Sequence, residues 1–136
     1  MRRKIFARHS SPWSAWTRLL SAPLVLVPVW TRRWSHAAGV AAWMLANPVI
    51  FPPPADDRSF ATKAILGEEM WIERRPKDTA MAVNMAASAA GVAAAIAARK
   101  RRALPATAAT ATQIALLLVY WRMMNEYYEK HRDSAD

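Results

Sequence analysis

The charged residues that could do chemistry are concentrated in one stretch, LGEEMWIERR at 66–75, which lies between two apolar halves of the chain. Helical periodicity places Glu68 and Arg75 on the apolar face of a helix there. A carboxylate in such a position can exchange a proton or bind a cationic group, because burial disfavours its charged form. It can also be a structural partner of Arg75, Arg18 or another arginine. We favour the structural interpretation, since ion-pair networks also place charges beside apolar groups.

The remaining residue patterns do not define a catalytic, metal or cofactor site. His9 and Glu69 are the groups that would assist Glu68 in a membrane-embedded enzyme or transporter component. No two histidines are four residues apart, and no histidine lies three or four residues from a glutamate, so the spacing does not indicate a metal site. The three glycines form no phosphate-binding loop. We therefore expect no cofactor, favour a protein that is not an enzyme, and assign no catalytic, metal-binding or cofactor-binding residue.

The distribution of positive charge favours a membrane location over nucleic-acid binding. The 136 residues include 19 Lys and Arg against 10 Asp and Glu, a net charge of +9, and no cysteine, which excludes disulfides. The basic residues lie between uncharged apolar blocks instead of along one helix face, as they do in loops that flank a membrane. Membrane lipid is therefore the expected partner, and nucleic acid is not expected. The mean hydropathy of −0.04 is low for such a protein because its ends and centre are charged.

Four apolar blocks predict the membrane-spanning elements. They cover residues 19–30, 36–51, 79–98 and 104–121. The first two are shorter than the ~20 residues that cross a bilayer, and together they predict a helical hairpin over 19–51. Arg32 and Arg33 at its turn would cost at least ~2.5 kcal/mol each at mid-bilayer, so two short spans are favoured over a re-entrant loop. The same arginines disfavour a cleavable signal peptide.

The second half of the chain predicts two longer helices. The third span, residues 79–98, is rich in alanine, which is nearly neutral for insertion, so this helix needs a packing neighbour. Asn84 lies on its line of small residues, and Gln113 in the fourth block is the predicted hydrogen-bond partner of Asn84. The fourth helix is predicted over 104–131, with its last turns extending beyond the membrane into the cytoplasm.

An extended corner and an amphipathic helix join the two halves. Prolines at 52–54 fix an extended connection, and Asp56 is the first of three N-cap residue types, so the amphipathic helix is predicted over 56–75. The basic, Trp-rich N-terminus at 1–18 completes a single membrane domain, residues 1–136. The predicted fold class is all-α: a small helical membrane protein of about four short transmembrane helices plus an interfacial amphipathic helix.

The loop charges also predict an orientation. In a four-span arrangement, the outer side carries only Arg32, Arg33 and the run RKRR at 99–102, and every other Lys and Arg lies on the side of the termini. This arrangement favours a multi-pass protein of the cell membrane with both termini in the cytoplasm. A three-span arrangement, in which residues 19–30 do not cross, would place the run 99–102 inside.

Three stretches occur in a fixed order along the first part of the chain. They are RHSSPWSAWTR at 8–18, NPVIFPPP at 47–54 and LGEEMWIERR at 66–75. Together they resemble an uncharacterised family of small bacterial and archaeal integral-membrane proteins, one of the domains of unknown function. The resemblance covers about the first 80 residues and implies a short helical membrane protein. It supplies no activity, but it makes Glu68, His9 and Asn47 the first positions to mutate.

These features predict a non-enzymatic function, that of a small accessory or scaffold subunit. Such a subunit would pack through its Ala-rich spans and central helix against a second copy or a larger membrane partner. The first alternative is an enzyme or transporter component that uses Glu68 with His9 or Glu69, and the second is a peripheral basic protein that binds anionic lipid or nucleic acid. The candidate structural or functional polar positions are Glu68, Arg75, Arg18, His9, Asn47, Asn84 and Gln113.

Overall fold

The computed structural model describes residues 10–74 and 77–132, and in these ranges every regular element is a helix. The elements are α2 (Pro12–Ser21), the 3₁₀ turn η1 (Ala22–Val25), α3 (Leu26–Thr31), α4 (Trp34–Ile50), α5 (Phe60–Arg74), α6 (Thr79–Arg99) and α7 (Ala103–His131). The all-α prediction is therefore confirmed for the described part of the chain.

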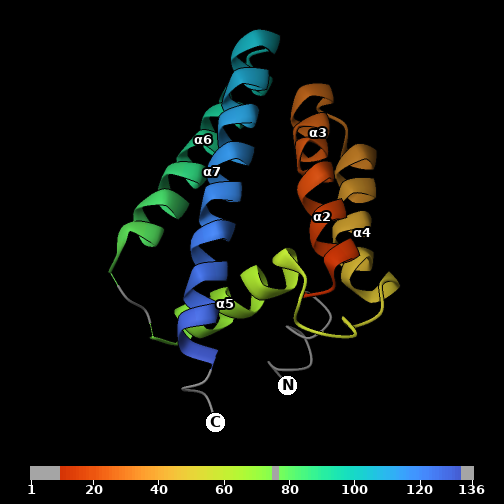
Figure 1. Ribbon diagram of the computed structural model, residues 1–136. Helices are drawn as coiled ribbons and strands as arrows, with labels where there is room; N and C mark the ends of the chain where they lie inside the picture. The colour runs from red at the N-terminus through yellow and green to blue at the C-terminus, as the bar shows by residue number, and fades with distance from the viewer. Residues whose placement is uncertain (1–9, 75–76, 133–136) are drawn as a thin grey trace.

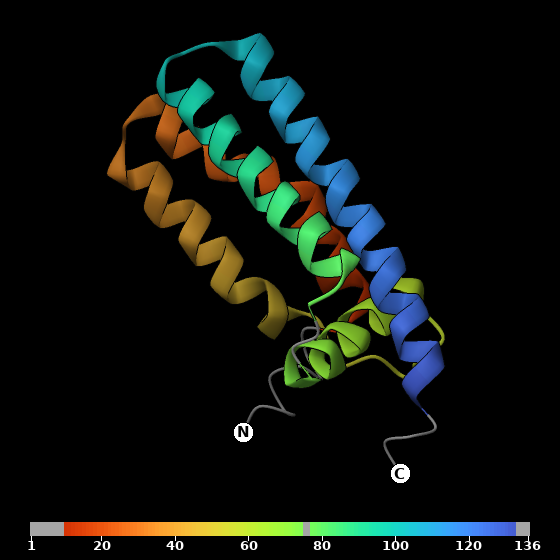
Figure 2. The same ribbon diagram turned by 90° about the vertical axis from the view of Figure 1, so that its left-hand side faces the viewer.

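Two helical hairpins stand side by side, and α5 lies across their ends (Figures 1 and 2). The first hairpin pairs α4 with an arm formed by α2, η1 and α3 in line, and the second pairs α6 with α7. The first arm starts at Pro12, earlier than the predicted start of the hairpin at residue 19. Proline suits the first turn of a helix, where its missing N–H is not needed, so the Trp-rich segment folds as the base of this arm.

Helix α5 begins at Phe60, so the predicted start at residue 56 is wrong. The side chain of Asp56 accepts a hydrogen bond from the Arg58 backbone N–H at 3.0 Å, which closes a local turn in place of a helical one. The helix then reaches Arg74, the last described residue before the gap at 75–76.

Among the described residues, two helices are long and apolar enough to cross a membrane, namely α6 and α7. The predicted number of four such helices is not reached, because η1 interrupts the first arm and α4 has only 17 residues. In the most apolar stretches of α6 and α7 only 22% and 11% of residues are buried. Most residues of these two stretches are therefore at least partly exposed in the single chain.

The turns of both hairpins lie at the end of the molecule opposite α5 (Figures 1 and 2). They carry six basic residues, which we call the cationic end: Arg32, Arg33, Arg99, Lys100, Arg101 and Arg102. Arg32 and Arg101 have positive φ angles of 57° and 55°, a conformation that costs a residue with a side chain roughly 1–2 kcal/mol. The guanidinium of Arg32 donates to the backbone carbonyl of Arg99 at 3.3 Å, which ties the two turns together.

Candidate functional site

Glu68 lies where α5 meets α2 and α7. Its Oε1 accepts a hydrogen bond from the Tyr120 hydroxyl at 3.1 Å, and its charge attracts that of Arg18. Burial raises the pKa of the Glu68 carboxyl above its usual range, and the Tyr120 hydrogen bond and the Arg18 charge offset part of that effect. Glu68 is therefore a carboxylate with two partners whose charged form is still disfavoured.

A cavity of about 290 Å³ opens beside Glu68 and Arg18. Glu68 and Arg18 are its two charged lining residues. The other lining residues are Ala15, Leu19, Ala22, Ile65, Leu117 and Trp121. An apolar cavity with one acid and one base on its wall can hold a small polar group or a few waters next to a carboxylate that exchanges protons.

Asn47 joins the two arms of the first hairpin through a buried hydrogen-bond network. Its side chain is fully buried, with Oδ1 accepting from the Ser14 hydroxyl and Nδ2 donating to Thr17 Oγ1, each at 2.8 Å. The Thr17 hydroxyl donates in turn to the Trp13 carbonyl at 2.6 Å. Both polar ends of the amide are therefore satisfied, as a buried Asn requires.

A backbone contact connects this network to Glu68. Arg18 Nε donates to the Ser14 carbonyl at 3.3 Å, and Ser14 is the residue that pairs with Asn47. We call the set Ser14, Arg18, Asn47, Glu68 and Tyr120 the motif junction. Its first four members come from the three stretches that carry the family resemblance, so the fold brings those stretches together at one place.

The start of α5 is held by the segment that precedes α2. The Thr62 hydroxyl donates to the Ser10 carbonyl at 2.7 Å, and Thr62 is fully buried. Thr62 is buried because the chain at Ser10 covers this side of the helix. Ala61, Ala64 and Trp71 of α5 are buried as well.

Two further contacts fix the position of α5. The Trp71 indole N–H donates to Asp78 Oδ2 at 3.0 Å, while Asp78 Oδ1 accepts from the Met81 backbone N–H and so caps α6. At Gly67 the helix passes so close to α7 that its backbone contacts that of Met124. These contacts set the angle at which Glu68 reaches Tyr120.

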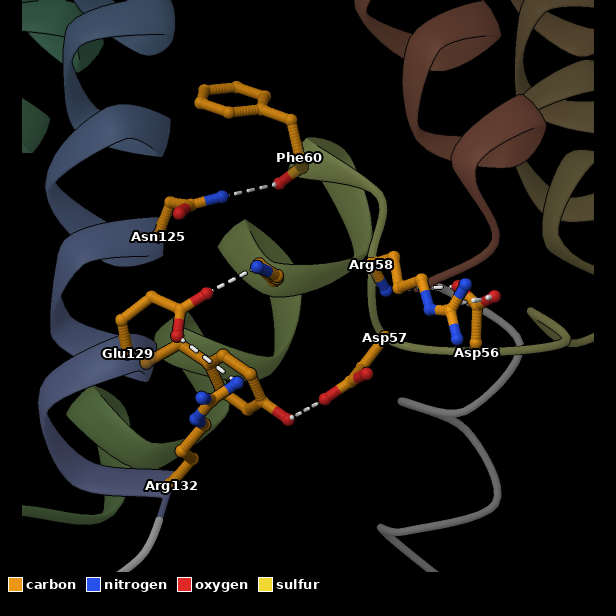
Figure 3. A network of polar contacts seen from close by, with 9 residues as sticks. Asp56, Asp57, Arg58, Phe60, Asn125, Glu129 and Arg132 are labelled. Carbon is orange, nitrogen blue, oxygen red and sulfur yellow. Dashed lines mark hydrogen bonds and ion pairs between the residues drawn. The ribbon is translucent and has the colours of Figure 1, made fainter.

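A second polar cluster lies on the outer side of α5, as Figure 3 shows. Lys63 pairs with Glu129, which also pairs with Arg132 at 3.2 Å. The Tyr128 hydroxyl donates to Asp57 Oδ2 at 2.7 Å, and this hydrogen bond holds the pKa of the Asp57 carboxyl below its usual range. The cluster fastens the connection before α5 to the last turns of α7.

Of the remaining predicted polar positions, two lie outside the described residues and two lie on α6 and α7. His9 and Arg75 lie outside the described residues, so a partnership of either with Glu68 stays a prediction. Gln113 does not pair with Asn84: a Cβ on Gly91 would lie 2.5 Å from Gln113 Nε2, so this amide lies across Gly91 instead. The spacing of the two residues along antiparallel helices was misjudged from the sequence.

Sequence reasoning missed several members of the site. Tyr120 could have been noticed in the sequence, because its hydroxyl group directly follows the apolar run 114–119. Only the structure shows that this hydroxyl pairs with Glu68. Ser14 and Thr17 follow i to i+3 spacing on α2, which predicts one face. Gly67 in the middle of a helix indicates a close contact with another backbone.

The described residues contain no group of three or more His, Asp and Glu that could hold a metal ion. The chemistry available at the motif junction is therefore that of one carboxyl group, a guanidinium and a phenol. These groups can accept a proton and bind a polar or charged group.

The fold and the junction define a small all-helical protein with two helices of membrane-spanning length. A family of unknown function, DUF6653, matches residues 2–105, and the chain belongs to this family. The match extends beyond the first 80 residues and includes all of α6. Comparison with curated proteins and with solved structures gives no significant match.

Proposed function

We propose that the protein is a multi-pass membrane protein that serves as a small accessory or scaffold subunit. The observation that carries this proposal is the low burial of α6 and α7, since only 22% and 11% of the residues in their most apolar stretches are buried in a single copy. In water such exposed apolar stretches would be unstable, whereas lipid chains or the helices of another protein cover them without cost.

The four helical arms support a membrane-embedded arrangement of both hairpins. The first arm has 20 consecutive helical residues from Pro12 to Thr31, about 30 Å in length, and the 17 residues of α4 span about 25 Å. These lengths approach the ~30 Å of the hydrocarbon core, and local thinning accommodates the difference. In this proposal α5 lies at the interface, and both termini are cytoplasmic.

The exposed side of α6 is the surface that we assign to the partner. Met85, Val92 and Ile96 are more than half exposed and follow helical spacing along one face. Ala87 and Ala94 face the interior and are buried against the rest of the chain. A second copy or a larger membrane protein would pack on the exposed face, where the alanines between these residues allow close approach.

Single cysteines test both the topology and the partner surface, because the chain has no native cysteine. Ser35 and Ala103 at the cationic end should label from outside intact cells, and Ser59 before α5 should be protected. Met85→Cys should form crosslinks to a second copy or a co-purifying protein, while Ala87→Cys at similar depth should not. A monomer in mild detergent without crosslinks from Met85→Cys would contradict the scaffold function.

The motif junction supports a second candidate, a transporter or enzyme component in which Glu68 carries a proton. The observation in its favour is the raised pKa of the Glu68 carboxyl at the wall of a cavity. Glu68→Gln keeps the shape of the side chain and the hydrogen bond from Tyr120. If that variant accumulates normally and loses its cellular phenotype, Glu68 acts chemically; if the protein itself is lost, Glu68 is structural.

A further inference from the structure

The cationic end contains a pocket with two kinds of wall. Its volume is about 640 Å³, and it lies between α3, the start of α4 and the end of α6. The apolar wall consists of Val25, Pro28, Val29 and Ala37. The other wall carries Arg32, Arg33, Arg99 and the indole of Trp34, which is 90% exposed.

No acidic residue of the described part of the chain lines this pocket. All 10 Asp and Glu of the chain lie between positions 56 and 78 or from 126 onward, and the described ones are at the α5 end of the molecule. The three guanidiniums come from two different hairpins and meet because Arg32 donates to the Arg99 carbonyl. The fold therefore concentrates positive charge that the sequence distributes over residues 32–99.

The backbone adds donors to the same pocket. Helix α4 begins at Trp34, its N-cap residue Arg33 makes no side-chain capping hydrogen bond, and its first turn contains no acidic residue. The first N–H groups of a helix without a cap attract an anion, and the helix dipole strengthens that attraction. Arginine side chains complement them, since a planar guanidinium binds phosphate oxygens with two hydrogen bonds.

We propose that this pocket binds an anionic phospholipid, with its phosphate between Arg33 and Arg99 and one acyl chain along the apolar wall. The proposal rests on the membrane location given above. Charge complementarity identifies the headgroup, and the apolar wall distinguishes a lipid from a free phosphate, because Val25, which is 48% exposed, lines the same pocket as the arginines. The exposed indole of Trp34 suits a membrane interface, where Trp is enriched.

The test uses the full-length protein purified in a neutral detergent, with phosphatidylglycerol, phosphatidylcholine and inorganic phosphate as separate probes. Native mass spectrometry counts retained lipid, and thermal unfolding reports stabilisation. The test variant is Arg33→Gln with Arg99→Gln. The control variant is Lys100→Gln with Arg102→Gln, which removes the same charge at the same end from residues that do not line the pocket.

We expect the wild type and the control variant to retain phosphatidylglycerol and to be stabilised by it, but not by phosphatidylcholine or phosphate. Each pocket arginine that is removed should lower the preference for the anionic lipid about fivefold. Equal retention of both lipids, equal loss in both variants, or stabilisation by inorganic phosphate alone would overturn the lipid site.

Carbonate extraction of membranes, done in parallel, separates this proposal from the one on which it rests. Release of the protein by carbonate would overturn the membrane location and the lipid site together. Retention in the membrane without a preference for phosphatidylglycerol would overturn the lipid site and leave the membrane location supported.

Discussion

Gly67 of α5 lies against the backbone of Met124 in α7. A Cβ atom at Gly67 would lie 2.0 Å from the Met124 carbonyl oxygen and 2.8 Å from its carbonyl carbon. Backbone atoms of two helices cannot move apart locally, so any side chain at this position displaces the whole of α5. Glu68 is the next residue, and its hydrogen bond with Tyr120 depends on this close crossing.

Gly67→Ala should therefore destabilise the protein by at least the ~1–3 kcal/mol typical of an overpacked core. Gly39→Ala is the matched control, because a Cβ at Gly39 meets nothing within 4 Å and alanine favours the helical backbone by roughly 0.5–1 kcal/mol. Thermal unfolding in detergent should show a lower Tm for the first variant and an equal or higher Tm for the second. Equal Tm values for the two variants would contradict the backbone contact.

Asn47→Ala should weaken the first hairpin. The change leaves the buried hydroxyl of Ser14 without its acceptor, at a cost of about 1–3 kcal/mol, whereas the half-buried Thr17 hydroxyl keeps its hydrogen bond to the Trp13 carbonyl. Asn84→Ala is the control, since the Asn84 hydrogen bond uses its backbone carbonyl and survives the change. Tm and protease resistance of the two variants measure the difference, and a loss no larger than that of the control would refute the role of the network.

Glu68 should give the protein a pH dependence of stability. The raised pKa of its carboxyl means that the folded state binds the proton more tightly than the unfolded state, whose Glu pKa is ~4.3. The stability that this tighter proton binding gives to the folded state is fully present below the unfolded-state pKa. It is lost as pH rises through the folded-state pKa of Glu68. The Tm of the wild type relative to Glu68→Gln should fall over this window, and a constant difference across pH would contradict a buried, proton-binding carboxyl.

Asp57 should respond in the opposite direction, because its pKa is lowered and its contribution to stability is lost as pH falls through the folded-state value. Tyr128→Phe removes the main cause and should raise the Asp57 pKa toward its ordinary range. Tyr127→Phe is the control, since Tyr127 stacks on His131 instead. Carboxyl carbon NMR titration distinguishes them, and an unchanged Asp57 pKa in Tyr128→Phe would disprove the assignment.

Local sequence patterns predicted the presence of helices better than the residues at which each helix begins and ends. Apolar blocks and the periodicity at 60–75 indicate each of the described helices except the first turns of α2, because these signals depend on neighbouring residues. The starts at Pro12 and Phe60 depended on contacts that the sequence does not display. The burial of Thr62 is not displayed by the sequence either, since it comes from Ser10, 52 positions away in sequence.

The candidate site was only half predictable. An acid on an apolar helix face drew attention to Glu68, and the resemblance drew attention to Asn47. Their partners could not be assigned, because the alignment of two packed helices decides which side chains meet, and Gln113 lies at Gly91, about two turns from the predicted Asn84. Distances between helices are a property of packing, and a single sequence gives no measure of them.

The placement of Tyr120 has a consequence for how the chain is assembled at the ribosome. The network around Asn47 closes within the first hairpin, so the side chains of Ser14, Thr17 and Asn47 can pair before the rest of the chain is synthesised. Glu68 is synthesised 52 residues before Tyr120, and α5 therefore emerges with its carboxylate lacking this partner. A nascent chain halted before α7 should keep α5 loosely attached and open to protease, and docking should follow only when the last helix has left the exit tunnel.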